Sequence, residues 1–246
     1  MAVRARRSVA GQHFLRSSTL AAEIVRHAGV GRGDLVLDLG AGTGILTRAL
    51  AQAGASVVAV ELDRELASRL RRRFSDVVEA DVRSFQLPRE PFLVVSNLPF
   101  GCSTEVLRRL LGPRVPLLAA HVIVQWEVAA KRTAVWPATR LGVEWSAWHE
   151  LSLVRRLPRC CFTPPPAVDA ALLRATRRTE PLVPVERADD YRRFVGAGFR
   201  HGLRAVVPPR QLKRLAADHG FARDARPRDL DPHQWAAIFC SVRRVG

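Results

Sequence analysis

The chain has 246 residues, 48% of them hydrophobic, a composition typical of a soluble globular protein with one sizeable core and a small appendage. It carries 39 Lys and Arg against 23 Asp and Glu, a net charge of +16, which favours a polyanionic partner, nucleic acid before a membrane surface. The sequence has no secretory signal, no apolar run long enough to span a membrane, no C-x-x-C pair and no metal-ligand spacing. We therefore expect a reduced, cytoplasmic protein with no metal and no membrane partner.

The first half of the chain alternates apolar runs with amphipathic stretches, a pattern typical of strands followed by helices. We expect helices at residues 45–53 and 63–73, the second capped by the Asp63 carboxylate. Strands are expected at residues 35–39, 56–60, 77–80, 92–95 and 117–125. This alternation predicts an α/β protein with a doubly wound parallel sheet.

The second half of the chain changes from strands to helices. Residues 150–157 and 168–176 are two further apolar runs without room for a helix between them, so we expect an antiparallel pair at the edge of the sheet. Beyond Pro181 and Pro184, the pattern predicts helices at residues 188–200, 209–219 and 232–243. We therefore expect residues 1–180 to form a catalytic domain and residues 181–246 a small, basic, all-α domain that binds RNA.

A glycine-rich turn, VLDLGAGTG at residues 36–44, follows the first predicted strand. Gly40, Gly42 and Gly44 remove side chains where a ligand must approach the backbone, and the next helix offers its N-terminus. The spacing differs from the G-x-G-x-x-G of dinucleotide sites, and Asp38 directly before it would repel a pyrophosphate and attract a cation. By itself the turn fits a structural role, a nicotinamide or flavin site, or a site for cationic S-adenosylmethionine (SAM), which we favour.

Two carboxylates at later strand ends strengthen the SAM prediction. Glu61 ends the second predicted strand, where an acid accepts from ribose hydroxyls, and Asp81 follows the third, where it can accept from an adenine amino group. Each acid alone is as readily explained as a helix cap or a surface charge. Acids at three consecutive strand ends share one crevice, because ligands of open α/β sheets bind at the carboxyl ends of the strands. The sequence thus predicts a class I, Rossmann-like, SAM-dependent methyltransferase sheet.

The stretch SNLPF, residues 96–100, ends the fourth predicted strand at the same crevice. A small polar residue, an amide, a proline and an exposed aromatic form an unusual exit from a sheet, and they suggest a flat polar ligand. At this point the sequence resembles the ribosomal RNA adenine N6-methyltransferases, which include the Erm macrolide-resistance enzymes and the dimethyladenosine transferases of small-subunit RNA. The resemblance is carried by GQHFL at residues 11–15, DLGAGTG at 38–44, VELD at 60–63, EADV at 79–82, NLPF at 97–100, QWEVAAKR at 125–132 and FTPPPAVDA at 162–170.

This resemblance implies roles for the motif residues. The side-chain oxygen of Asn97 and a backbone carbonyl of Leu98 or Pro99 would accept the two hydrogens of the target adenine amine, while Phe100 stacks on the flipped base. Alignment and desolvation would then suffice, without a covalent intermediate. His13 departs from the family, which commonly has Asn there, so an imidazole must replace an amide. The residues implied in SAM binding are Gln12, His13, Leu15, Asp38, Gly40, Gly42, Glu61, Leu62, Asp81, Val82 and Asn97.

Several features favour the Erm branch. Trp126 stands where the small-subunit enzymes usually have Lys, and DLDPHQWAAIF at residues 229–239 resembles the end of actinomycete Erm proteins. Residues 134–150 keep little of the Tyr-Gly-Leu-Ser stretch typical of the small-subunit branch. The implied substrate is one adenine in the peptidyl transferase loop of 23S rRNA, before ribosome assembly is complete, with resistance to macrolides, lincosamides and streptogramin B. The alternatives are a 16S rRNA adenine dimethyltransferase and a non-catalytic nucleic-acid-binding relative.

Contact with RNA is expected to be electrostatic and spread over the surface of a monomer. Any single arginine is more often a solvated side chain than a phosphate contact. The tryptophans at positions 126, 136, 145 and 148 could stack on bases, although we expect helical packing or core burial for most of them. The basic residues predicted to contact RNA are Arg4, Arg6, Arg7, Arg108, Arg109, Lys131, Arg132, Arg200 and Arg204.

Overall fold

The computed structural model describes residues 12–242, which form two compact units. The first unit runs to Leu110 and includes Val115–Ala129 and Leu153–Ala175. The second comprises Leu111–Arg114, Ala130–Ser152 and the chain from Thr176 onward. Within residues 12–242, no helix has the length and apolarity to span a membrane.

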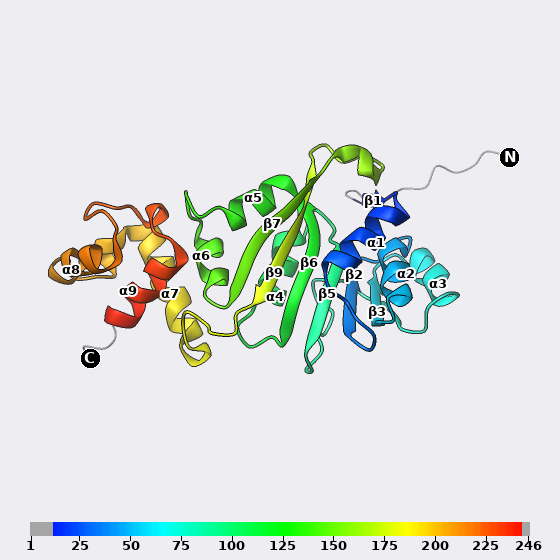
Figure 1. Cartoon of the computed structure of the whole chain (residues 1–246), viewed down its shortest axis with the longest axis horizontal. Coiled ribbons are helices and arrows are strands. Elements are labelled where there is room, and N and C mark those ends of the chain that lie inside the picture. The colour runs from blue at the N-terminus through cyan, green and yellow to red at the C-terminus, as the bar shows by residue number, and fades with distance from the viewer. Residues whose placement is uncertain (1–11, 243–246) are drawn as a thin grey trace. The chain divides into compact units, whose positions relative to one another are not determined.

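A seven-stranded sheet in the order β4-β3-β2-β5-β6-β9-β7 is the scaffold (Figure 1). The first five strands in this order pair in parallel. The doubly wound α/β fold predicted from the sequence is thereby confirmed, and the two later apolar runs lie side by side at the edge as β9 and β7. The strands are β2 (Leu35–Leu39), β3 (Ser56–Glu61), β4 (Val77–Glu79), β5 (Phe92–Asn97), β6 (Leu117–Gln125), β7 (His149–Leu157) and β9 (Ala170–Arg177).

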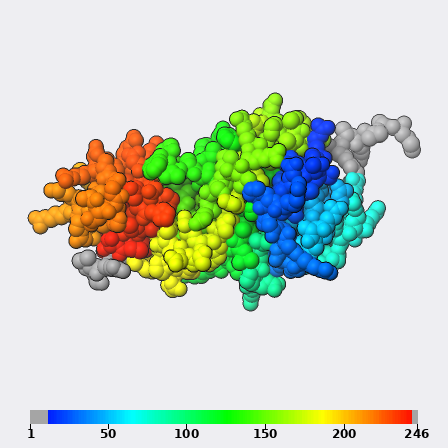
Figure 2. Space-filling view, in the orientation of Figure 1, coloured from blue at the N-terminus to red at the C-terminus, as the bar shows by residue number. Residues whose placement is uncertain are grey.

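Two helices, α1 (Ser18–His27) and α2 (Ile45–Gln52), cover one face of this sheet. Their buried leucines and isoleucines pack against β2, β5 and β6, and the two helices adjoin on the surface (Figure 2). Figure 1 shows α1 in front of the strands and α4 (Ser103–Leu110) behind them. The helix α3 (Arg64–Arg71) is capped by Asp63, whose Oδ1 accepts the Leu66 N–H at 3.0 Å, as predicted. The helix α5 (Trp126–Thr133) follows β6 directly.

A short strand near the start of the described chain was not predicted. This strand, β1 (Phe14–Leu15), pairs antiparallel with β8 (Phe162–Thr163), which follows the turn η1 (Arg159–Cys161). Phe14 lies opposite Thr163 and Leu15 opposite Phe162. The pairing brings Phe14 and Leu15 beside the start of the segment FTPPPAVDA, which lies about 150 residues later in the sequence.

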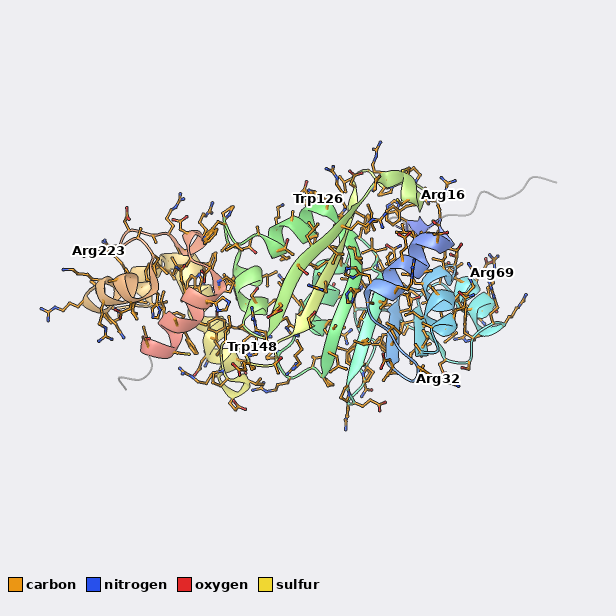
Figure 3. All side chains as sticks on the ribbon, viewed as in Figure 1. Arg16, Arg32, Arg69, Trp126, Trp148 and Arg223 are labelled. Carbon is orange, nitrogen blue, oxygen red and sulfur yellow. The ribbon has the colours of Figure 1, made fainter. Side chains whose placement is uncertain are left out.

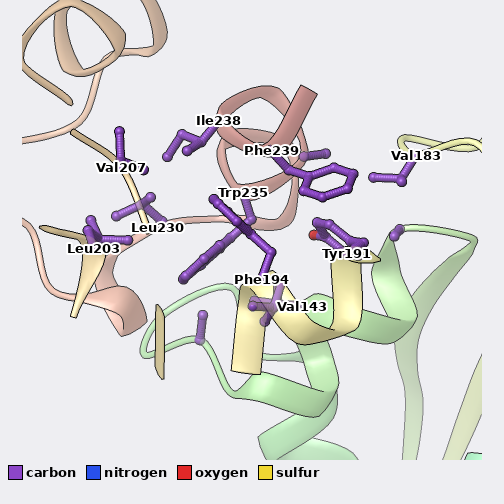
Figure 4. Close-up of a cluster of buried hydrophobic side chains, with 14 of the residues drawn as sticks. Val143, Val183, Tyr191, Phe194, Leu203, Val207, Leu230, Trp235, Ile238 and Phe239 are labelled. Atoms are coloured by element: carbon purple, nitrogen blue, oxygen red, sulfur yellow. The ribbon is translucent and has the colours of Figure 1, made fainter. Parts of the chain in front are cut away.

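The second unit is built mainly from helices around an aromatic core (Figure 4). Tyr191, Phe194, Trp235 and Phe239 meet edge to face, and the ring centroids of Tyr191 and Phe239 are 5.2 Å apart. Trp148 joins this core and donates from Nε1 to Val183 O at 2.9 Å. The elements are α6 (Arg140–Ser146), η2 (Val185–Arg187), α7 (Ala188–His201), η3 (Leu203–Ala205), α8 (Pro209–His219), η4 (Pro227–Asp229) and α9 (Pro232–Val242).

The three late helices lie where the sequence predicted them, although Arg243 at the end of the third is outside the described residues. The second unit also takes in α6 and residues 130–152. Assignment of catalysis to residues 1–180 and of RNA binding to residues 181–246 stays a prediction.

Candidate active site

A cavity of about 310 Å³ lies where β2, β3 and β5 end. Its walls combine one segment from the end of each of these strands with the segment that follows β4 and with residues 12–14. Leu15 and Asp38 border a small adjoining void instead, and Gly42 lines neither space. Within residues 12–242 no cluster of His, Cys, Asp and Glu could hold a metal ion. The predicted residues that line the cavity are Gln12, His13, Gly40, Glu61, Leu62, Asp81, Val82, Asn97, Leu98, Pro99 and Phe100.

The end of β3 accepts hydrogen bonds from the amides of the glycine-rich turn. The N–H groups of Gly40 and Ala41 both donate to Val60 O, at 2.8 and 3.0 Å, and the Gly42 N–H donates to Glu61 Oε2 at 2.7 Å. A pyrophosphate site needs free amides that point at the ligand, and these amides are taken. The turn therefore supports the interpretation of a cationic ligand over a dinucleotide.

Gly40 must be glycine for two separate reasons. Its φ is +79°, a conformation that L-residues with a side chain rarely adopt. A Cβ on Gly40 would also lie 3.1 Å from Cδ of Pro99, so a side chain would press on the SNLPF stretch. The bare backbone here forms part of the cavity wall.

Asp38 is buried below the turn, with 1% of its surface exposed. The Thr47 hydroxyl donates to its Oδ2 at 2.7 Å. Burial raises the pKa of Asp38 to about 7; the hydrogen bond from Thr47 opposes this rise and the Glu61 carboxylate adds to it. A cation bound nearby would stabilise the ionised carboxylate.

Glu61 is held rigidly at the end of β3. Its Oε2 accepts from Gly42 and its Oε1 accepts the Asp63 N–H at 2.9 Å, while only 3% of the residue is exposed. Each carboxylate oxygen keeps a further lone pair for a ligand hydroxyl. Glu61 can therefore accept hydrogen bonds from the glycine-rich turn and from the hydroxyls of a ribose at the same time.

Asp81 follows β4 and accepts several hydrogen bonds from Arg83, two residues later. The Arg83 Nε lies 3.0 Å from both Asp81 oxygens, and the Arg83 N–H of the backbone donates to Oδ1 at 2.8 Å. These hydrogen bonds from Arg83 hold the pKa of Asp81 below its usual range. Asp81 therefore stays an ionised acceptor at the cavity wall.

Asn97 ends β5 with one half of its amide paired. The side-chain nitrogen donates to His13 O at 2.6 Å. Because a carbonyl can only accept, the nitrogen must face His13, and this fixes the orientation of the amide. The other end, Oδ1, is buried, and no group among the described residues hydrogen-bonds to it. A buried acceptor without a donor is costly, so this atom indicates a donor supplied by a ligand.

Phe100 is not the exposed aromatic that the sequence suggested, since only 8% of its surface is exposed. Its ring centroid lies 5.4 Å from that of His13 and 6.2 Å from that of Phe162. Both neighbours arrive through the β1–β8 pairing, and the His13 Nδ1 hydrogen-bonds to Pro164 O at 2.8 Å. The remaining surface of Phe100 faces the cavity that Asn97 also lines.

The basic residues predicted to contact RNA have different surroundings. Arg4, Arg6 and Arg7 lie outside the described residues. Arg108, Lys131, Arg200 and Arg204 are exposed, and the labelled arginines of Figure 3 likewise lie on the periphery. Arg109 instead binds backbone carbonyls of residues 82 and 85, and Arg132 binds Thr139 Oγ1 and packs over Trp145. Of the four tryptophans, Trp145 and Trp148 are buried and Trp136 is 63% exposed.

Four residues of the cavity wall were not predicted from the sequence: Phe14, Arg83, Gly101 and Cys102. Each lies one or two positions from a predicted site residue, so extending the predicted set by two positions along the chain finds them. Ser96 also acts here, since its Oγ accepts the Leu39 N–H at 2.8 Å and so ties the ends of β2 and β5 together.

Comparison with known proteins agrees with this geometry. Residues 3–239 match the ribosomal RNA adenine dimethylase family. The mycinamicin-resistance protein MyrB of Micromonospora griseorubida is 37% identical, over 96% of this chain and 79% of the relative. An rRNA adenine N-6-methyltransferase of Bacillus licheniformis is 31% identical, over 93% of this chain and 84% of the relative. The crystal structure of the 23S rRNA methyltransferase ErmE superposes with a TM-score of 0.83 at 30% identity, covering 93% of this chain and 99% of that one.

Proposed function

The chain belongs to the ribosomal RNA adenine dimethylase family, and from that premise we propose that it methylates N6 of one adenine in the peptidyl transferase loop of 23S rRNA. It is a SAM-dependent rRNA adenine N6-methyltransferase with the class I methyltransferase fold. The 23S assignment is supported by the similarity to ErmE, and a role in macrolide, lincosamide and streptogramin B resistance by the similarity to MyrB. The observation that carries the proposal is Asn97, a residue of the cavity wall whose buried Oδ1 has no hydrogen-bond partner among the described residues.

The cavity residues fit SAM. Gly40 leaves space against Pro99 that a Cβ would fill. The cavity wall carries the carboxylates of Glu61 and Asp81, and the amides of Gly40 and Ala41, which a pyrophosphate would need, already donate to Val60 O. Glu61 would hold the ribose and Asp81 with Val82 the adenine, while Gln12 and His13 would cover the methionine end. When bound, the cofactor supplies an electrophilic methyl group on a cationic sulfonium.

The chain's own part in the reaction is to align the target amine. The lone pair of an adenine amine is delocalised into the ring, so the nitrogen must be held where it can become pyramidal. Asn97 Oδ1 would accept one amine hydrogen. Leu98 O is the better candidate for the second, because Pro99 O already accepts the Cys102 N–H at 3.1 Å. The ring of Phe100 would stack on the base and exclude water.

The proposed substrate sets the partner and the compartment. We propose that the enzyme acts as a monomer on 23S rRNA before assembly of the large subunit is complete, and therefore in the cytoplasm. The exposed residues Arg108, Lys131, Arg200 and Arg204 supply positive charge for phosphates. The net charge of +16 supports an electrostatic, salt-dependent contact of this kind.

The first experiment incubates the protein with labelled SAM and total ribosomal RNA, followed by primer extension across the peptidyl transferase loop. We expect label in 23S rRNA and a stop at one adenine. Label confined to 16S rRNA would identify a small-subunit dimethyltransferase instead, and RNA binding without any label would indicate a non-catalytic relative.

A variant pair tests the role of Asn97. We expect Asn97→Ala to lower the rate of methyl transfer by about a hundredfold or more, because the acceptor for the amine is lost, while SAM affinity changes by less than about tenfold. Asn97→Asp keeps an oxygen acceptor but loses the donor to His13 O, so it should retain more activity than Asn97→Ala. Equal activity of wild type and Asn97→Ala would remove the amide from the mechanism.

A further inference from the structure

Arg109, on the last turn of α4, connects this helix to a loop that lies 24 to 27 residues earlier in the sequence. Its Nη1 donates to Val82 O at 2.7 Å and its Nη2 donates to Phe85 O. The side chain is half-buried, whereas its neighbour Arg108 is exposed. Two N–H groups of the Arg109 guanidinium therefore donate to one short segment of backbone.

That segment, residues 81–85, lies between β4 and β5 and belongs to no strand or helix. It is folded as a tight turn, because Asp81 O accepts the N–H groups of both Ser84 and Phe85, at 3.0 and 2.8 Å. Asp81 and Val82 form cavity wall, so the position of this turn sets the position of the Asp81 carboxylate. Arg109 binds two other carbonyl oxygens of the same turn, Val82 O and Phe85 O.

The same helix begins just after the SNLPF stretch. From Asn97 the chain passes through Phe100 and Cys102 directly into α4 at Ser103. Arg109 thus joins the two walls of the cavity, one that ends in Asn97 and one that carries Asp81. Its charge also contributes, after that of Arg83, to the lowered pKa of Asp81.

We propose that Arg109 is a positioning residue for cofactor recognition, which holds the turn of residues 81–85 so that Asp81 meets the adenine amine of SAM. This inference rests on the proposed function, because it assumes that the cavity binds SAM. A guanidinium suits the task since its planar fork reaches two carbonyls at once, whereas the ammonium of a lysine is a point donor. The competing role for Arg109, an RNA phosphate contact, becomes an outcome of the test.

The experiment uses two ligands that differ at the edge of the base that Asp81 would bind, since the inosine base has a 6-oxo group and an N1–H where adenine has a 6-amino group and a bare N1. S-adenosylhomocysteine carries the 6-amino donor and S-inosylhomocysteine carries a 6-oxo acceptor, so wild type should prefer the first by about tenfold or more in calorimetry. We expect Arg109→Met to weaken S-adenosylhomocysteine binding about tenfold and to bring the preference close to one. Arg109→Lys should lie between wild type and Arg109→Met. The matched control Arg108→Met should keep the wild-type preference, because its side chain is exposed.

RNA affinity separates the two roles of Arg109. Affinity of Arg109→Met for a 23S hairpin, and its salt dependence, should equal those of wild type. A phosphate contact would instead weaken RNA binding and lower the salt slope by about one, with ligand preference unchanged, and this result would overturn the proposal. A uniform weakening of both ligands would likewise overturn it, because it indicates a purely structural role.

Two further outcomes are distinguishable. Should Arg109→Met fail to fold, Arg109→Lys carries the test, and a preference equal to that of wild type then contradicts the inference. If wild-type protein binds neither ligand, the proposed function fails first, and the role of Arg109 fails with it. Binding by wild type with an unchanged preference in Arg109→Met would remove only the role of Arg109.

Discussion

Replacing Asp38 by Asn should make the stability of the protein less sensitive to alkaline pH. Asp38 is 1% exposed, and burial raises its pKa from 3.8 to about 7. The folded protein therefore keeps a proton that the unfolded chain releases at much lower pH. Stability from this group is fully present below the unfolded pKa, declines as pH rises and is lost once pH passes the folded pKa.

The size of the effect follows from the two pKa values of Asp38. A difference of about three units corresponds to about 4 kcal/mol in the free energy of unfolding at full ionisation. About 2 kcal/mol of that is lost between about pH 5.5 and about pH 8.5. For a chain of this size, such a loss lowers Tm by about 4 to 8 °C. An Asn at position 38 does not titrate, so the variant escapes this loss.

The assay is thermal unfolding of wild type and Asp38→Asn at both pH values. The buried amide adds a donor whose cost does not depend on pH, so the quantity to compare is the change in Tm difference between the two pH values. We expect the variant to gain about 4 to 8 °C relative to wild type at the higher pH. Asp224→Asn, at an exposed position, should show no such gain. An equal Tm difference at both pH values would refute the reasoning about Asp38.

Three further substitutions test the packing and the electrostatics. His121 is 5% exposed and burial lowers its pKa to about 4, so wild type loses stability as pH falls below about 6.5. Between pH 7.5 and pH 5, the free energy of unfolding of His121→Leu, measured by denaturant unfolding, should fall by about 2 kcal/mol less than that of wild type. A Cβ on Gly198 would lie 2.5 Å from the Trp235 ring, so Gly198→Ala should lower the free energy of unfolding by about 1 to 3 kcal/mol, and an unchanged Tm would contradict this packing. Gly40→Ala would strain φ and press on Pro99, so SAM affinity measured by calorimetry should fall about tenfold, and unaltered affinity would argue against a role for the turn.

Much of the scaffold could be predicted because its signals are local. Five apolar runs became the parallel strands, and the late helical patterns became α7, α8 and α9. The helix α1 was missed, although Ser17 caps it through the Leu20 N–H. The strand β1 was also missed, because two residues carry no periodicity and their partner, β8, is remote in the sequence.

The sequence by itself determined the chemistry of the strand ends. Glu61, Asp81 and Asn97 each follow an apolar run, and parallel strands bring such residues to the same edge of a sheet, where all three line one cavity. Local pattern and strand direction suffice for that prediction, because both are properties of short segments.

Only the tertiary structure decided how those groups are held. In the folded chain the Asn97 amide donates to the His13 carbonyl, and Phe100 packs between His13 and Phe162. Arg109, which the sequence suggested as an RNA contact, donates to two backbone carbonyls. These outcomes depend on contacts between segments that are distant along the chain. The partner of an arginine and the desolvation of a carboxylate are set by that packing, which local sequence patterns do not specify.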